Sequence, residues 1–196
     1  MLALSTARRF PGKGGRVSFE QIGHIRRVFA NVPGSVFKTL VTHHPLGDPT
    51  GQKPYGVAGR SAHVLKALAE VDVHLLLSGH GHRPLSGAMK FEAVAHRSIL
   101  VLHAGTAIST RTRDGHGNTY NLVDIDRDAV SIRMMEWADW YGFRERQKND
   151  YRAADGSWQR ISRQESLKSK AGNRLLTPSP PYTPARTKIC DSPKEN

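Results

Sequence analysis

The sequence has little cysteine and no long apolar run. Its single cysteine, Cys190, lies near the C-terminus, which excludes an internal disulfide framework and a cysteine-rich zinc ribbon. No apolar stretch approaches the roughly 18 residues of a membrane-spanning helix, and the first residues lack the apolar core of a signal peptide. We therefore expect a cytoplasmic protein with no membrane partner.

Acidic residues are scarce relative to basic ones. The 196 residues include 29 Lys and Arg against 17 Asp and Glu, which gives a formal net charge of +12. The excess is spread along the chain, whereas a nucleic-acid-binding face concentrates charge on one helix or stripe. We expect weak, salt-sensitive attraction to polyanions but no specific nucleic-acid partner. The same excess would attract a phosphate-bearing substrate.

The first half of the sequence predicts alternating strands and helices. Residues 1–4 read as the end of a strand, and Ser18 with Gln21 forms a capping box that opens a helix ending before Pro33. Apolar runs predict buried strands over 36–42 and 73–77, and helical spacing predicts a second helix over 61–71. A Pro- and Gly-rich loop fills 45–58. The expected fold class is therefore α/β, with flanking helices.

The second half predicts strands and then a tail. Segments 99–103, 119–124 and 129–137 are rich in β-forming residues, with little helix between them, which favours antiparallel pairing. We expect one domain over 1–145 and a basic, Pro- and Ser-containing tail over 146–196. The run Thr177–Pro184 cannot bury enough apolar surface to offset its ordering entropy, so the tail is expected to be largely disordered.

Histidines directly follow two of the predicted strands. The first group lies in Val41-Thr-His-His-Pro-Leu46, and the second lies in Leu77-Ser-Gly-His-Gly-His-Arg-Pro84. Side chains just past the carboxyl ends of strands in an α/β sheet face the crevice where ligands bind. Neutral imidazole is a ligand for Zn, Fe, Mn or Ni. The pattern indicates a metal site.

These motifs resemble those of the calcineurin-like metallophosphoesterase family. A His before x-Pro appears as His43-His44-Pro45, and Gly-His-x-His appears as Gly79-His80-Gly81-His82. The segments Ala104-Gly-Thr-Ala and Asn118-Thr-Tyr-Asn-Leu are similar to those that follow the ligands in small bacterial members related to cyclic-nucleotide phosphodiesterases. The resemblance covers roughly residues 1–145. It implies the C-terminal part of an α/β sandwich with mixed sheets.

The resemblance also implies roles for individual residues. His43 and His80 would bind one metal and His82 the other, in a site that holds two divalent ions (Mn, Fe or Zn) when complete. His44 would lie behind the ligands or face the substrate, and Arg111, with Arg113, would approach the substrate phosphate; His44 and Arg111 are thus the catalytic candidates. The implied activity is hydrolysis of a small-molecule phosphoester, with phosphodiesters among the candidate substrates.

The sequence departs from the family by lacking its acidic motifs. Three motifs are missing: an Asp-x-His that closes a strand, Gly-Asp-x-x-Asp and Gly-Asn-His. The N-terminal βαβ part is therefore expected to be absent, and the gene product truncated or mis-started. Two divalent ions on three neutral imidazoles lack the anion that offsets their charge. Three hypotheses stay open: a hydrolase, a non-catalytic remnant or binding module, and a basic nucleic-acid binder.

The other histidines have weaker claims. Asp72-Val73-His74 spells Asp-x-His, but it opens a strand, and six extended residues put His74 roughly 20 Å from His80. His103 is a candidate for contact with substrate or metal because it precedes Ala104-Gly105. The remaining histidines have no motif and are expected at surface or helix positions: His24, His63, His96 and His116.

Overall fold

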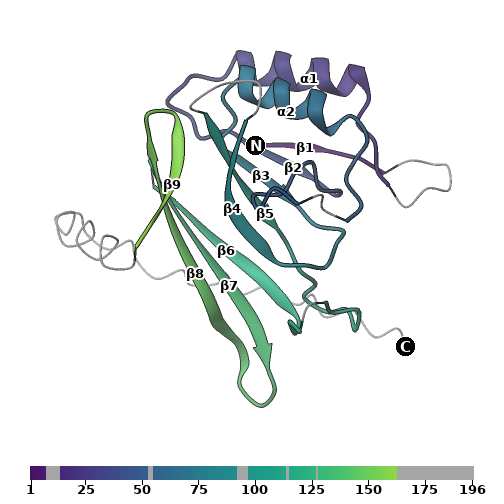
Figure 1. Cartoon of the computed structure of the whole chain (residues 1–196), viewed down its shortest axis with the longest axis vertical. Helices are drawn as coiled ribbons and strands as arrows, with labels where there is room; N and C mark the ends of the chain where they lie inside the picture. The colour runs from purple at the N-terminus through teal and green to yellow at the C-terminus, as the bar shows by residue number, and fades with distance from the viewer. Residues whose placement is uncertain (8–13, 53–54, 92–96, 114, 127, 163–196) are drawn as a thin grey trace, which may run out of the picture.

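A computed structural model describes residues 1–7, 14–52, 55–91, 97–113, 115–126 and 128–162. Residues 163–196 of the tail expected over 146–196 lie outside the described residues, as do His96 and residues 8–13. Within them, the helices are too short and too polar to span a bilayer. The described residues form two sheets and two helices, so the fold class is α/β as predicted (Figure 1).

The first sheet has five strands in the order β1-β2-β3-β5-β4. Its members are β1 (Leu2–Leu4), β2 (Thr39–Thr42), β3 (Leu75–Ser78), β4 (Leu85–Lys90) and β5 (Ser98–His103). Strands β1, β2, β3 and β5 are mutually parallel, and β4 pairs antiparallel with β5. The carboxyl ends of four strands therefore meet at one edge of the sheet.

Both helices cover one face of the first sheet (Figure 1). Helix α1 (Phe19–Ala30) has the predicted capping box between Ser18 and Gln21, which confirms that prediction. Helix α2 (Ser61–Glu70) packs beside it. Apolar side chains of α1 and α2 meet alternate residues of the strands, among them Leu40, Leu76 and Val101, all with no exposed surface.

The second sheet covers the opposite face of the first. Its strands, in the order β6-β7-β8-β9, are all antiparallel neighbours: β6 (Thr119–Asp126), β7 (Ala129–Ala138), β8 (Gly142–Ala154) and β9 (Ser157–Ile161). A core lies between the sheets and joins Leu75, Leu100 and Leu102 to Ile132 and Trp158. The molecule thus has three layers: helices, first sheet and second sheet.

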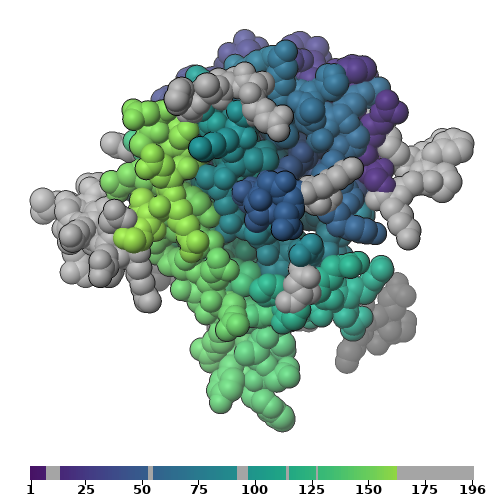
Figure 2. Space-filling model, in the orientation of Figure 1, coloured from purple at the N-terminus to yellow at the C-terminus, as the bar shows by residue number. Residues whose placement is uncertain are grey.

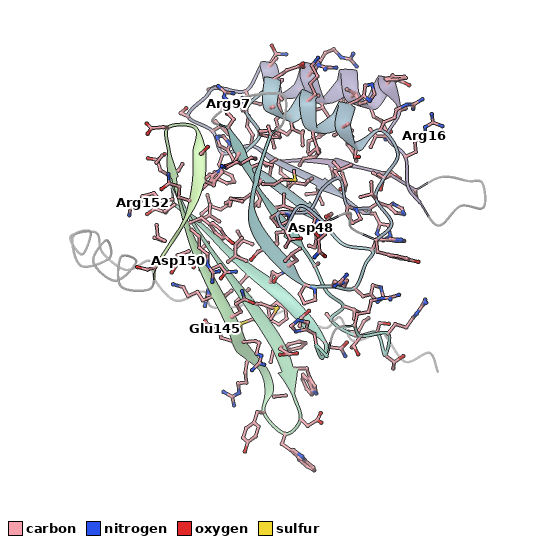
Figure 3. The ribbon with its side chains drawn as sticks, in the orientation of Figure 1. Arg16, Asp48, Arg97, Glu145, Asp150 and Arg152 are labelled. Atoms are coloured by element: carbon pink, nitrogen blue, oxygen red, sulfur yellow. The ribbon has the colours of Figure 1, made fainter. Side chains whose placement is uncertain are left out.

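The outer face of the second sheet has no covering layer among the described residues. Figure 3 shows Asp150 and Arg152 on the side of β8 that points away from the first sheet. The hairpin of β7 and β8 projects beyond the rest of the molecule (Figure 2). This sheet is therefore apolar on one side only, the arrangement expected of an antiparallel sheet.

Several predicted boundaries were wrong. The ordered chain does not end near 145, because β8 and β9 continue to Ile161, and β4 was missed. Strand β2 begins at Thr39 instead of Val36, since Val36 lies in a turn whose amide donates to the Pro33 carbonyl. Segment 99–103 pairs with β3 and β4, whereas 119–124 and 129–137 pair antiparallel as predicted.

Candidate metal centre

The strand ends place the two histidine motifs side by side. Val41 of β2 is paired with Leu77 of β3, so the residues that follow each strand emerge together. The Gly79 amide donates to the His43 carbonyl at 3.0 Å and fixes the two turns to each other. This pairing brings together His43 and His80, which are 37 residues apart in sequence.

Three imidazoles form a cluster at this edge, which we call the histidine cluster: His43, His44 and His80. One ligand nitrogen of each lies within 4.8 Å of the others. The His80 Nδ1 and His43 Nε2 atoms are 3.2 Å apart, and the His44 and His80 ring centroids are 4.3 Å apart. His43 is exposed, His80 is half-buried and His44 is buried. The cluster therefore opens to solvent on the His43 side.

His44 contacts the residues that follow β1. The His44 Nδ1 lies 2.8 Å from the hydroxyl of Thr6, which has no exposed surface. Gly15 packs on the same ring, because a Cβ there would lie 2.3 Å from His44 Nδ1. Burial lowers the pKa of His44, and the neighbouring His80 and His43 rings lower it further. His44 is thus a neutral imidazole at neutral pH.

His80 and His82 are presented by an unusual backbone. Both have positive φ, 67° and 54°, in the left-handed region that residues other than glycine rarely adopt. Tyr55 of the 45–58 loop stacks over His80 with an interplanar angle of 8°. Gly56 lies against the same ring, where a Cβ would come within 2.4 Å of His80 Cδ2. Tyr55 and Gly56 therefore form a wall of the site.

His82 is not a member of the histidine cluster and instead contacts the 104–113 segment. Its Nδ1 lies 2.8 Å from the Arg111 carbonyl, and because a carbonyl only accepts, Nδ1 must donate and Nε2 keeps its lone pair. The guanidinium of Arg113 lies over the Tyr55 ring, 5.4 Å from its centroid. Both arginines are exposed, so they bring positive charge to the mouth of the site.

A cavity of about 180 Å³ adjoins the histidine cluster. Its wall includes Asp48, which Figure 3 labels, together with Tyr55 and Arg83. His103 also lines it and donates from Nε2 to the Gly47 carbonyl at 3.0 Å. Burial lowers the pKa of His103, against the opposing effects of Asp48 and of that hydrogen bond. His103 is thus a neutral side chain of the cavity wall and lies outside the cluster.

The histidine cluster could hold one metal ion, with its three ligand nitrogens within 4.8 Å of one another. Zn–N bonds of about 2.0–2.1 Å in tetrahedral geometry put two ligand nitrogens about 3.3 Å apart. The 3.2 Å between His43 and His80 matches this separation. In the described part of the chain the cluster contains three histidines and no carboxylate. It therefore suits a single ion better than two neighbouring ions, because no anion in the cluster would offset their mutual repulsion.

The remaining histidines lie away from this site. His74 precedes β3, at the opposite end from His80; its Nδ1 accepts from the Lys38 amide at 2.9 Å and its ring stacks on Phe37. His24 and His63 are exposed on the helices. Sequence reasoning missed the contacts of Thr6, Gly15 and Tyr55 with the histidines. The one related signal was the Pro- and Gly-rich composition of 45–58, which predicted a loop directly after the first histidine motif.

Comparison with known proteins yields structural likeness alone. No protein-family model matches the sequence, and no curated protein matches it either. Solved structures of Vps29 from Entamoeba histolytica are similar over most of their length. A single mutant has 11% identity and a TM-score of 0.33, covering 76% of this chain and 98% of that one. At such values the likeness assigns neither a family nor an activity.

Two further forms of the same protein give similar values. The wild type complexed with Zn²⁺ has 11% identity and a TM-score of 0.34, covering 76% of this chain and 97% of that one. A double mutant has 11% identity and a TM-score of 0.28, covering 82% and 94%. The case for function therefore comes from this chain's own residues.

Proposed function

We propose that this chain is a calcineurin-like metallophosphoesterase domain whose histidine cluster binds a divalent metal ion for phosphoester hydrolysis. The observation that carries the proposal is the 3.2 Å approach of His43 to His80, one from each motif of the resemblance. The two residues follow neighbouring parallel strands, where an α/β sheet binds its ligands. Mn, Fe or Zn are the ions that suit imidazole ligands.

Each residue near the cluster has a task in this proposal. His43, His44 and His80 would hold the ion, and His82, with its Nε2 lone pair, would hold a second ion where a complete site forms. A bound divalent ion supplies Lewis-acid polarisation of the phosphoryl oxygens. Arg111 and Arg113 would attract and orient the anionic phosphoester, and the wall formed by Tyr55 would limit the access of water. The expected partner is a small-molecule phosphoester in the cytoplasm.

A specific observation favours a second candidate, a metal-binding module without catalysis. The cluster has no carboxylate to balance the charge of a second ion. Phosphoryl transfer with two ions depends on both to stabilise the attacking and leaving oxygens. In this second candidate, the single ion held by imidazoles binds a phosphoester without accelerating its hydrolysis.

The decisive experiment measures metal retention and hydrolysis on the same preparations. The full chain is loaded with Mn²⁺ or Zn²⁺, dialysed, assayed for bound metal, and then incubated with bis(p-nitrophenyl) phosphate. We expect about one ion per chain and metal-dependent release of p-nitrophenol. His80→Ala should abolish both, while His24→Ala, an exposed histidine of α1, should change neither.

The outcomes separate the two candidates. Retained metal without hydrolysis would select the binding module. Loss of metal from the unsubstituted chain during dialysis would reject both candidates.

A further inference from the structure

The turn between β7 and β8 exposes two large aromatic side chains. Trp140 and Tyr141, which we call the aromatic tip, are 98% and 70% exposed. The hairpin that carries them projects beyond the rest of the molecule (Figure 2). Side chains this exposed remove almost no apolar surface from water, so they contribute little to the stability of the fold.

The backbone holds Trp140 in a conformation that glycine adopts at lower cost. The Tyr141 amide donates to the Ala138 carbonyl at 3.1 Å, which closes a β-turn with Trp140 at its third position. Trp140 has a φ of 71°, and a positive φ at this position alone is the pattern of a type II turn, which favours glycine or asparagine there. A bulky residue in this region stores backbone strain, and such strain concentrates at functional sites. Neither packing nor backbone conformation therefore accounts for a tryptophan at this position.

The aromatic tip combines apolar rings with polar ends and a neighbouring positive charge. Indole and phenol each have an apolar ring and one N–H or O–H group, the combination that places Trp and Tyr at the level of lipid headgroups. The guanidinium of the exposed Arg144 lies over the Tyr141 ring, 5.7 Å from its centroid. Arginine can keep its charge among headgroups while its methylene groups lie along apolar surface. The turn also contains Asp139, whose carboxylate accepts from the Trp137 indole at 3.3 Å.

Shape and charge favour a lipid surface over a nucleic acid as the partner of the aromatic tip. Residues 129–154, which form the hairpin, contain five basic and four acidic side chains, so the hairpin itself is nearly neutral. Binding to single-stranded nucleic acid relies on a positively charged groove along the backbone, and the hairpin is a convex projection with balanced charge. A bilayer surface accepts a projecting aromatic side chain without a shaped pocket. The net charge of +12 on the whole chain attracts an anionic leaflet.

We propose that the aromatic tip inserts into the headgroup region of an anionic lipid bilayer and docks this chain on the membrane surface. Two contributions combine: burial of the Trp140 and Tyr141 rings, and attraction between the positive chain and the anionic lipids. The chain then lies on a membrane without spanning it, which departs from the expectation of no membrane partner. The proposal is independent of metal binding and of hydrolysis.

Co-sedimentation of the full chain with lipid vesicles tests the proposal. The vesicles contain phosphatidylcholine alone, or phosphatidylcholine and phosphatidylglycerol in equal parts. The unsubstituted chain should bind the mixed vesicles more tightly than the neutral ones. The double variant Trp140→Ala with Tyr141→Ala should bind the mixed vesicles about tenfold more weakly, because the apolar area that would be buried is lost. Ile108→Ala is the matched control, since Ile108 is 93% exposed but lies outside the hairpin, and its binding should not change.

Fluorescence measures whether the aromatic tip enters the bilayer. Brominated phosphatidylcholine in the mixed vesicles should quench the tryptophan emission of the unsubstituted chain. Trp140→Ala should lose most of this quenching, because Trp158 is buried in the core and Trp137 is half-exposed and packed on Phe143. Quenching that persists in Trp140→Ala would show that another part of the chain meets the lipid.

A glycine variant separates binding from folding. Trp140→Gly should weaken vesicle binding as Trp140→Ala does, while its midpoint of urea denaturation is unchanged or higher, because glycine adopts a positive φ without strain. A lower midpoint for Trp140→Gly would mean that the tryptophan serves the fold, which would overturn the argument from strain.

The proposal fails if the unsubstituted chain does not sediment with the mixed vesicles. It also fails if the double variant binds them as tightly as the unsubstituted chain, or if Ile108→Ala loses as much binding as the double variant. Without vesicle binding, two further measurements would assign the aromatic tip elsewhere. Loss of single-stranded oligonucleotide binding in the double variant would assign it to nucleic acid. A dimer that becomes a monomer in the double variant, measured by sedimentation equilibrium, would assign it to a second copy of the chain.

Discussion

The two sheets bury their side chains differently, and only one of them carries the candidate site. In the first sheet successive residues face the helices and the second sheet in turn, so Leu75 and Leu76 are both buried. The second sheet is buried on one side only, and its hairpin projects with Trp137 and Trp140 at 49% and 98% exposure. A sheet packed on both faces holds its strand ends in fixed register, which is what a cluster of three imidazoles needs.

The largest expected effect compares two tryptophans of the second sheet. Trp158 is 6% exposed between the sheets and packs edge-on against Phe37, whereas Trp140 is 98% exposed at the hairpin tip. Trp158→Ala should lower the free energy of unfolding by about 3–5 kcal/mol, the range for large-to-small core substitutions. Trp140→Ala should change it by less than about 0.5 kcal/mol. Urea denaturation followed by circular dichroism measures both, and equal effects would mean that the sheets do not share a core.

A leucine pair extends the comparison across the two sheets. Leu40 in β2 has no exposed surface beneath the helices, and Leu122 in β6 is 37% exposed. Leu40→Ala should lower the free energy of unfolding by about 2–5 kcal/mol. Leu122→Ala should have a much smaller effect, because Leu122 lies on the outer face of the second sheet, which has no covering layer among the described residues. A large loss for Leu122→Ala, measured in the same urea titrations, would indicate that a further surface covers this sheet.

The sequence predicted the first sheet better than the second for a physical reason. Strands buried on both faces read as continuous apolar runs, such as 99–102, and such runs are visible without knowing the partner. In β8 only Asn149 and Tyr151 are buried, and Asn149 is polar, bonded to the Ser86 hydroxyl at 2.8 Å. A strand with so little apolar signal reads as a charged tail, which is why the end of the domain was placed too early.

The candidate site was predictable only in part for a similar reason. His43 and His80 each follow an apolar run, so their position at the strand ends could be inferred from sequence. Thr6 and Gly15 meet His44 through the pairing of β1 with β2 and through a loop that crosses it, and no local pattern encodes such an approach. The resemblance likewise gave roles to His82 and Arg111 but not the hydrogen bond between them.

A smaller effect is expected at the helix that covers the first sheet. The Ser18 hydroxyl accepts from the Gln21 amide at 3.0 Å, and the Gln21 side chain accepts from the Ser18 amide at 2.8 Å. Ser18→Ala should lower the free energy of unfolding by about 1 kcal/mol, while Ser18→Gly should cost only a few tenths. Thermal unfolding followed by circular dichroism distinguishes them. Identical losses would show that the cap does not contribute through its side chain.

The smallest expected effect is a pH dependence that originates in the first sheet. Burial lowers the pKa of His74, Lys38 lowers it further, and Asp72 opposes both. Because the unfolded chain binds the proton more readily, the stabilisation is complete above the unfolded pKa near 6.5 and is lost as pH falls through the lower folded pKa. His74→Asn keeps an acceptor for the Lys38 amide and removes the titrating group. Between pH 7 and pH 5 its free energy of unfolding should therefore fall less than that of the unsubstituted chain. The difference in slope corresponds to a fraction of one proton. His24→Asn, on the exposed face of α1, serves as the control. If the slope is unchanged in His74→Asn, the acid sensitivity would instead be assigned to the two buried histidines, His44 and His103, at the edge that carries the site.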